Sequence, residues 1–256
     1  MDDGLVGVVL AAGAGTRLRP LSRWRPKALC PVGGVPLVDL AIERVWPHVE
    51  QVAVNLHHGA AALDAHLPWS VHRSWERPEA LGTAGALGHL RSWSGGRGLL
   101  VSNADAWLGP TAGAAVAELV EGWDREHHRL LCVRDARRGD FGDLRYCGVA
   151  LVPAAAAARL EAVPSGLYEV AWREAWEAGA LDLVEADVAF VDCGTPADYL
   201  RANLEASGGA SVIGSGASVA STAVVECSVV WDGARVDDGE VLVRGVRTPE
   251  GTVLVR

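Results

Sequence analysis

A glycine-rich turn followed by two cations is the part of this sequence whose residue types and spacing could do chemistry. The turn reads LAAGAGTRLRP, with Gly13 and Gly15 ahead of Arg17, and Lys27 follows in a Pro-Lys pair. Glycines let backbone N–H groups approach an anion closely, and a nest of such groups binds phosphate. Arg17 and Lys27 supply positive charge for a polyphosphate. The pattern predicts a phosphate-binding loop, with a generic glycine turn as the alternative.

Lys27 is the only lysine among the 23 lysines and arginines of the chain. An ammonium is a compact point charge that the planar fork of arginine does not copy. A compositional bias against lysine is the alternative explanation, in which Lys27 remains by chance and has no special role. The glycine turn beside Lys27 favours a role in handling phosphate instead.

Two familiar glycine motifs do not fit this turn. The dinucleotide-binding fingerprint needs a third glycine where this chain has Leu18. A P-loop needs a Gly-Lys-Ser/Thr run, and Lys27 lies too far along the chain to supply it. The turn is therefore a phosphate loop of another kind.

A second polar group follows a predicted strand at 98–102, where the chain reads Asn103, Ala104 and Asp105. Open α/β sheets bind ligands at the carboxyl ends of their strands. Magnesium is held in proteins by one or two carboxylates together with substrate phosphates. Asp105 is thus a candidate metal ligand, although an aspartate in this position also caps turns and helices.

The elements that must position these residues alternate between strand and helix. The apolar run from Leu5 to Ala11 is typical of a strand buried on both faces. Further strands are predicted at 51–56, 71–75, 98–102, 129–134, 144–152, 181–185 and 188–191, and helices at 36–46, 60–67, 83–91, 113–123, 154–162, 168–178 and 196–206. The alternation predicts an α/β fold, with a Rossmann-like, mainly parallel sheet and helices on both faces.

The composition changes after Ser207, where apolar residues recur about every six positions, as in Ile213, Val219 and Val225. Hexads of this kind wind into a parallel β-helix of roughly 18 residues a coil. We therefore predict two domains, 1–207 and 208–256, the second a short left-handed β-helix stub. A stub of two to three coils should dock on the main domain or on a second subunit. A plain β-rich tail is the alternative.

The bulk composition excludes several classes of protein. A net charge of -9 and a pI near 5.4 give no electrostatic reason to expect nucleic-acid binding. No apolar run approaches the roughly 20 residues that cross a bilayer, and the acidic start lacks the basic residues of a signal peptide. The five cysteines suggest neither a disulfide framework nor a zinc site. We expect a cytoplasmic protein.

The segment LAAGAGTRLRPL, followed by Pro-Lys27 and then PVGGVPL, closely resembles the start of the sugar-1-phosphate nucleotidylyltransferases. The resemblance extends over residues 5–206, and a hexad tail occurs in many members. It implies that the loop residues and Arg17 hold the triphosphate of a nucleotide, and that Lys27 contacts phosphate at the reacting centre. The implied nucleotide-binding loop comprises Leu10, Ala11, Ala12, Gly13, Ala14, Gly15 and Thr16.

The same resemblance assigns the metal. VDCGTPADY is similar to a family segment whose first aspartate is a metal ligand, which is Asp192 here. Asp105 and Asp192 are then the two expected ligands of Mg²⁺. Asp198 fits better as a structural residue in a first helical turn.

A further family segment approaches the base and ribose, and this chain matches it with Leu81, Gly82 and Thr83. Glu76 could accept a hydrogen bond from a base, or it could equally be a solvated loop carboxylate. Both alternatives stay open at this point.

The sugar half departs from the family pattern, because the second lysine that binds the sugar phosphate is missing. We expect Asn103 and Gly148 at the sugar, and Arg145 (or Arg134) in place of that lysine. The sugar pocket looks trimmed, as in compact relatives that act on mannose 1-phosphate or N-acetylmuramate 1-phosphate.

The implied reaction is Mg²⁺-dependent transfer of a nucleoside monophosphate from an NTP to a sugar 1-phosphate, with release of pyrophosphate. Mannose 1-phosphate with GTP is the first expectation. N-acetylmuramate 1-phosphate uridylyltransferase, or another uridylyl- or thymidylyltransferase, is the alternative. A non-catalytic regulatory subunit would have lost the loop arginine, the lysine or an aspartate, and all are present here. A β-helix acyltransferase needs a histidine in the helix, and none follows Ser207.

Overall fold

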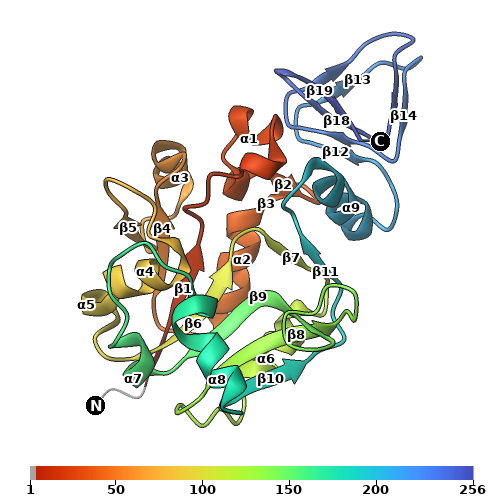
Figure 1. The fold of residues 1–256 in the computed structure, drawn as a ribbon. Helices are drawn as coiled ribbons and strands as arrows, with labels where there is room; N and C mark the ends of the chain where they lie inside the picture. The colour runs from red at the N-terminus through yellow and green to blue at the C-terminus, as the bar shows by residue number, and fades with distance from the viewer. Residues whose placement is uncertain (1–3, 256) are drawn as a thin grey trace.

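A twisted seven-stranded sheet forms the centre of the protein, in the order β10-β8-β9-β6-β1-β4-β5 (Figure 1). The computed structural model describes residues 4–255. Strand β9 runs antiparallel to both of its neighbours, and the other pairs in this sheet are parallel. The prediction of a mainly parallel sheet is confirmed. The strands are β1 (Leu5–Leu10), β4 (Val52–Leu56), β5 (His72–Trp75), β6 (Gly98–Asn103), β8 (His128–Arg134), β9 (Leu144–Val152) and β10 (Leu181–Glu185).

The apolar run of β1 is buried on both sides, as predicted. Val6 and Val8 pack into one hydrophobic cluster, and Leu5 and Val9 pack into the other. Side chains of a strand alternate between the two faces of a sheet, so a central strand covered on both sides must be apolar throughout.

Helices cover both faces of the sheet. One face is covered by α2 (Leu37–Val45), α3 (Ala60–His66) and α6 (Ala112–Val120). The other is covered by α4 (Gly82–His89), α7 (Ala154–Ala157) and the π-helical turn η4 (Tyr168–Trp172), which continues into α8 (Arg173–Glu177). The short elements η3 (Trp46–His48) and α5 (Arg91–Ser94) follow α2 and α4. No helix within residues 4–255 has the length and apolar character needed to cross a membrane.

Two helices differ from the sequence prediction. The helix expected at 154–162 ends at Ala157, and the chain then runs irregularly to Leu167. The helix expected at 168–178 begins as the π-turn η4. The chain between them packs against α4, where a side chain at Gly85 would lie 2.2 Å from the carbonyl oxygen of Val163. This long-range contact overrides the local helical pattern.

The phosphate loop and the Asn103 strand meet at one edge of the sheet. Strands β1 and β6 pair in parallel, and Leu10 lies opposite Asn103 in the register. The carboxyl ends of both strands therefore open at the same place. The loop then continues through η1 (Thr16–Leu18), α1 (Leu21–Trp24), η2 (Lys27–Leu29) and the small hairpin β2 (Pro31–Val32) and β3 (Val35–Pro36).

A separate two-stranded sheet lies beside this edge. Strand β11 (Phe190–Asp192) pairs antiparallel with β7 (Ala106–Leu108), so the strand predicted at 188–191 lies outside the main sheet. Helix α9 (Pro196–Ala206) follows β11 and has the bounds predicted from the sequence. Its first turn is capped by Thr195, whose side chain accepts a hydrogen bond from the backbone N–H of Asp198.

The C-terminal residues form short strands beside α1, β2 and α9 (Figure 1). Each early strand pairs in parallel with one further along, as Val212 does with Val229 and Val224 with Val241. The last two strands form an antiparallel hairpin. The elements are β12 (Val212–Ile213), β13 (Ser218–Val219), β14 (Val224–Glu226), β15 (Val229–Val230), β16 (Arg235–Val236), β17 (Val241–Val243), β18 (Gly245–Thr248) and β19 (Gly251–Leu254).

Candidate active site

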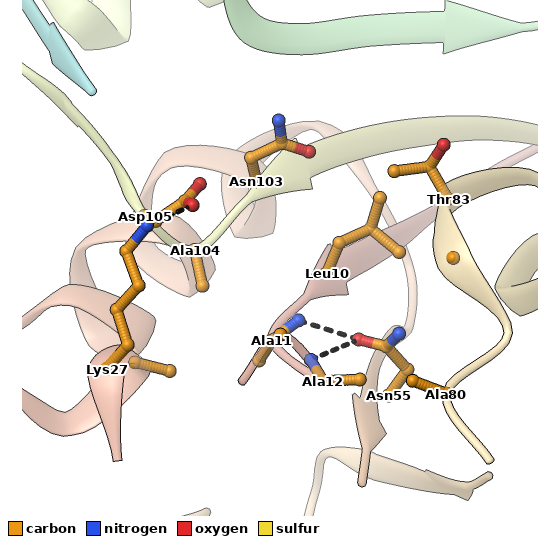
Figure 2. A pocket seen from close by; sticks show the side chains of 13 residues that line it. Leu10, Ala11, Ala12, Lys27, Asn55, Ala80, Thr83, Asn103, Ala104 and Asp105 are labelled. Carbon is orange, nitrogen blue, oxygen red and sulfur yellow. Dashed lines mark hydrogen bonds and ion pairs between the residues drawn. The ribbon is translucent and has the colours of Figure 1, made fainter. Parts of the chain in front are cut away.

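The start of the phosphate loop is held by a buried asparagine from the neighbouring strand. The backbone N–H groups of Ala11 and Ala12 donate to Oδ1 of Asn55 over 2.6 and 3.3 Å (Figure 2). Asn55 lies on β4, which pairs with β1. This side chain fixes how the chain leaves the sheet to form the loop. Asn55 was not predicted to belong to the site, since a polar residue in a strand can have many partners.

Glu76 completes this buried network. Its Oε1 accepts from the amide of Asn55 over 2.8 Å, and its Oε2 accepts from the backbone N–H of Leu81, also over 2.8 Å. Only 2% of Glu76 is exposed, so the expectation of a solvated loop carboxylate is wrong. Both carboxylate oxygens have partners inside the protein. We therefore propose that Glu76 holds the Asn55 amide and the Leu81 turn in place instead of reading a base.

Glu76→Gln tests this role. A glutamine keeps the shape but presents a second donor in a network that needs two acceptors, so one buried group loses its partner. We expect the free energy of unfolding to fall by about 1–3 kcal/mol, measured by urea denaturation, with the preference among NTPs unchanged. The exposed neighbour Glu79 supplies the control, because Glu79→Gln should change neither. A changed NTP preference with unchanged stability would instead indicate that Glu76 recognises the base.

Thr83 lies on the opposite side of the pocket from Lys27 (Figure 2), and Gly82 lines the same pocket. Gly82 has φ +70°, and a Cβ there would lie 2.5 Å from the carbonyl oxygen of Ser165. Thr83 accepts a hydrogen bond from the backbone N–H of Leu167. The glycine therefore permits the close approach of the protein's own chain, which in turn fixes this wall of the pocket.

Lys27 lies between the two predicted metal-binding aspartates. Its Nζ is 2.5 Å from Oδ2 of Asp105 and 3.9 Å from Oδ1 of Asp192, and a guanidinium nitrogen of Arg17 is 3.6 Å from Oδ2 of Asp192. The lysine side chain is 10% exposed, whereas that of Arg17 is 70% exposed. Gly15 is required beside the lysine, because a Cβ there would lie 2.9 Å from Cβ of Lys27. The structure thus brings both predicted cations and both predicted carboxylates together.

The β7–β11 pair explains how residues so distant in the sequence meet. Asp192 lies opposite Ala106 in the register, and the backbone N–H of Cys193 donates to the carbonyl oxygen of Asp105 over 3.0 Å. The backbone hydrogen bonds of this small sheet therefore set the separation of the two carboxylates.

A buried arginine braces the loop that carries Asp105. The guanidinium of Arg44, on α2, donates to the hydroxyl of Ser102 and to the carbonyl oxygen of Ala106, each over 2.8 Å. Burial lowers the pKa of Arg44 to about 10. Its two bonds hold the chain on either side of Asn103 and Asp105. No sequence pattern indicated this role, because Arg44 occupies an ordinary position in an amphipathic helix.

Two pockets meet at Asn103 and Asp105, which line both. The first has a volume of about 220 Å³ and is lined by Lys27 and by the loop from Leu10 to Gly13, whereas the loop residues at 14–16 do not line it. The second has a volume of about 310 Å³ and lies on the side of Arg17 and Asp192. The first is lined by Leu10, Ala11, Ala12, Gly13, Lys27, Ala28, Asn55, Ala80, Gly82, Thr83, Asn103, Ala104 and Asp105, and the second by Arg17, Asn103, Asp105, Ala106, Asp140, Arg145, Tyr146, Gly148, Phe190 and Asp192.

The second pocket contains the three residues expected at the sugar. Arg145 lies with its guanidinium 4.8 Å from the ring centre of Phe190 and 3.7 Å from a carboxylate oxygen of Asp135. Gly148 has φ +87°, and a Cβ there would lie 2.6 Å from Cβ of Ala106. The alternative cation, Arg134, pairs with Glu185 and does not line this pocket. Tyr146 and Phe190 were missed, since aromatic residues in strands are usually read as core.

The donor set suits a hard divalent cation. The side chains of Asp105 and Asp192 are 40% and 34% exposed, so their oxygens are accessible to a cation that also binds substrate phosphate. Within residues 4–255 no group of three or more histidines, cysteines, aspartates and glutamates is arranged to hold a metal. Magnesium is commonly bound by one or two carboxylates, with substrate phosphates completing its coordination.

Comparison with known proteins identifies the family. The model of the MobA-like NTP transferase domain matches residues 7–178, which include the loop, Lys27, Asp105 and most of the central sheet. The chain belongs to this family. The resemblance of the glycine loop to nucleotidyltransferases is therefore confirmed.

This chain is similar to curated proteins that include a sugar-1-phosphate uridylyltransferase. It is 39% identical over 130 residues to the N-acetylmuramate alpha-1-phosphate uridylyltransferase of Caulobacter vibrioides, covering 47% of this chain and 54% of that protein. It is 44% identical over 89 residues to the bifunctional protein GlmU of Alkalilimnicola ehrlichii, covering 34% of this chain and 18% of that protein. The matched region thus spans about half or less of these curated relatives.

Solved structures share the fold of this chain. The mannose-1-phosphate geranyltransferase from Thermus thermophilus superposes with a TM-score of 0.74 at 18% identity, covering 98% of this chain and 95% of that one. The UDP-glucose pyrophosphorylase from Acinetobacter baumanii gives a TM-score of 0.61 at 14% identity, covering 77% and 91%. At these identities the likeness concerns the fold alone.

Proposed function

We propose that this protein transfers a nucleoside monophosphate from an NTP to a sugar 1-phosphate and releases pyrophosphate. The observation that carries the proposal is the position of Lys27, whose ammonium lies between Asp105 and Asp192 where the two pockets meet. The first pocket suits the nucleotide and the second suits the sugar phosphate. Their shared boundary is where the two substrates would react.

The chain's own residues would act by positioning and by charge. The part of the loop from Gly13 to Thr16 would hold the triphosphate through its backbone N–H groups, with Arg17 beside it, while the N–H groups of Ala11 and Ala12 keep their bonds to Asn55. A sugar-phosphate oxygen would attack the α-phosphorus in line, and pyrophosphate would leave. Such chemistry depends on positioning and charge neutralisation more than on acid–base groups. Lys27 would stabilise the negative charge that develops at the α-phosphate.

We further propose that Asp105 and Asp192 hold Mg²⁺. When bound, the ion neutralises phosphate charge and helps to align the two substrates. Lys27 lies near both carboxylates and Arg17 lies near Asp192, so two cations face the two carboxylates before a substrate arrives.

For the substrates, we propose N-acetylmuramate 1-phosphate with UTP as the first pair to test. The relative with that named activity is 39% identical over 130 residues. Mannose 1-phosphate with GTP, the first expectation from the sequence, is the second candidate. It is supported by the segment from Leu81 to Gly85 and by the apolar hexads of the C-terminal residues.

A pyrophosphate-release assay of four NTPs against a panel of sugar 1-phosphates tests the proposal. We expect turnover with at least one pair, dependent on added Mg²⁺. Binding of a sugar nucleotide by calorimetry without turnover of any pair would favour the non-catalytic regulatory alternative. The panel includes glucose, mannose, N-acetylglucosamine and N-acetylmuramate 1-phosphates, because these differ at the groups that the second pocket would contact.

Arg145 and Arg134 offer a matched test of the sugar pocket. We expect Arg145→Ala to raise the KM for the sugar 1-phosphate by about tenfold or more, because a charge-assisted hydrogen bond is worth roughly 1.5–3 kcal/mol. The KM for the NTP should change little. Arg134→Ala removes a cation outside the pocket and should leave both constants unchanged. Equal effects of the two substitutions on the sugar KM would contradict this assignment.

We retain the division into 1–207 and 208–256, with the second part a left-handed β-helix stub, as a proposal. Its support is the set of parallel strand pairs in which Val212 lies opposite Val229, Ser218 opposite Arg235 and Val224 opposite Val241. A constant offset of this kind is the spacing of one coil. The exposed apolar side chains of Val241 and Leu254 support association with a second copy, which light scattering of the purified protein would test.

A further inference from the structure

Trp231, from the C-terminal segment, is completely buried against the main body of the protein. It directly follows β15 and is 1% exposed. Its indole N–H donates to the hydroxyl of Tyr199 over 2.9 Å, and that hydroxyl donates to the carbonyl oxygen of Pro31. One tryptophan thus joins three segments that are far apart in the sequence.

Two of these segments carry the central residues of the candidate active site. Pro31 begins β2, separated by a single residue from the end of η2, the turn that starts at Lys27. Tyr199 lies in the first turns of α9, directly after the segment that carries Asp192. The contact between Tyr199 and Pro31 therefore joins the segment of Lys27 to the segment of Asp192, and Nζ and Oδ1 of these two residues lie 3.9 Å apart.

Arg25 ties the C-terminal segment to the other side of Lys27. Its guanidinium lies 4.6 Å from the ring centre of Trp231, and it forms an ion pair of 3.7 Å with Asp232. Arg25 immediately precedes Pro26 and Lys27. The chain that carries the lysine is thus held by Trp231 and Asp232 before it and by Tyr199 after it.

The hydrogen-bonding groups in this contact leave little freedom. A buried indole N–H, hydroxyl or carbonyl without a partner is unfavourable, so the three groups keep one arrangement. Asn203 strengthens it from α9, since its amide donates to the carbonyl oxygen of Pro31 and accepts from the backbone N–H of Gly33. Trp231 is the member of this network that comes from the C-terminal segment.

We propose that Trp231 is a positioning residue, through which the C-terminal segment holds Lys27 and Asp192 at their working separation. The inference rests on the proposed nucleotidyl transfer. It gives residues 208–256 a part in forming the active site, beyond packing against it.

Two variants and two readouts test the proposal. Trp231→Phe removes the indole donor, and Tyr199→Phe removes only the hydroxyl that links Trp231 to Pro31. We expect either variant to lower kcat by about tenfold or more, because small misplacements of reacting groups are costly, while the KM of each substrate changes by less than about twofold. Amide hydrogen exchange of residues 25–33 and 192–199, measured without substrate, should become faster. If Trp231→Phe does not fold, Tyr199→Phe alone decides.

Leu242→Ala is the control, because Leu242 packs in the interior of the C-terminal segment with Val230, Ala234 and Val236. It should lower the thermal midpoint of unfolding while kcat at 25 °C and exchange at 25–33 stay parental. The proposal is overturned if Leu242→Ala lowers kcat as much as Trp231→Phe does. It is also overturned if Tyr199→Phe keeps parental kcat and exchange. Should the parent turn over no substrate pair, the proposed function fails, and the exchange comparison still decides whether Trp231 holds the two segments.

Discussion

Lys27→Ala is expected to lower kcat for pyrophosphate release by at least roughly 10²–10³-fold, the usual effect of removing one group that stabilises transition-state charge. The ammonium lies 2.5 Å from Asp105 and 3.9 Å from Asp192. Without it, two carboxylates face a polyphosphate with no fixed cation between them. The loss should appear in a continuous pyrophosphate assay at saturating substrates.

Lys27→Arg should recover little of this activity. The guanidinium is larger and planar, and Gly15 already packs against the lysine stem. Arg23, an exposed cation on α1, provides the control, since Arg23→Ala removes a positive charge from the same stretch of chain without touching either carboxylate. Circular dichroism and thermal melts of each variant establish that the fold is kept. Near-parental turnover by the folded Lys27→Ala variant would show that Lys27 is not needed for catalysis.

Asp105→Asn is expected to reduce kcat by about 10³-fold, which corresponds to the several kcal/mol that a bound metal ion contributes to the transition state. Asparagine preserves the shape but removes the charge that pairs with Lys27 and that would bind Mg²⁺. The fold should survive, because the bond from Cys193 goes to the backbone carbonyl of Asp105 and not to its side chain. Higher Mg²⁺ concentrations should be needed for half-maximal activity.

Asp64 provides a matched control for Asp105. Its side chain is similarly exposed, at 45%, and it pairs with a cation, Arg73, at 3.0 Å. Asp64→Asn should therefore alter kcat and the Mg²⁺ requirement by less than about twofold. If Asp105→Asn shows an unchanged Mg²⁺ requirement, Asp105 is not a metal ligand, whatever its effect on kcat.

Much of the fold could be predicted because its signals are local. The apolar run of β1 reflects burial on both faces of a parallel sheet, and the Thr195-Pro196 pair specifies the start of α9. Glycine spacing likewise predicted a tight turn after β1, and the structure shows that a side chain at Gly15 would meet the stem of Lys27. In each case the residue type determines the backbone conformation or the burial directly.

The roles of Glu76 and of the chain after Ala157 could not be predicted in the same way. Glu76 is a carboxylate in a loop, and only the approach of Asn55 and Leu81 makes it a buried acceptor. The residues after Ala157 favour a helix locally, but the packing of Val163 and Ser165 against the glycines of α4 prevents it. Long-range contacts decided both.

The sequence by itself therefore predicted the nucleotidyltransferase family, which the comparisons confirm, and proposed the phosphate loop, Lys27 and the two aspartates as its site, because these depend on residue types at fixed spacing. Only the tertiary structure decided how those residues are held. Arg44, Asn55 and Trp231 act through hydrogen bonds to partners far along the chain. The identity of such a partner depends on which segments the fold brings together, and no local pattern records it.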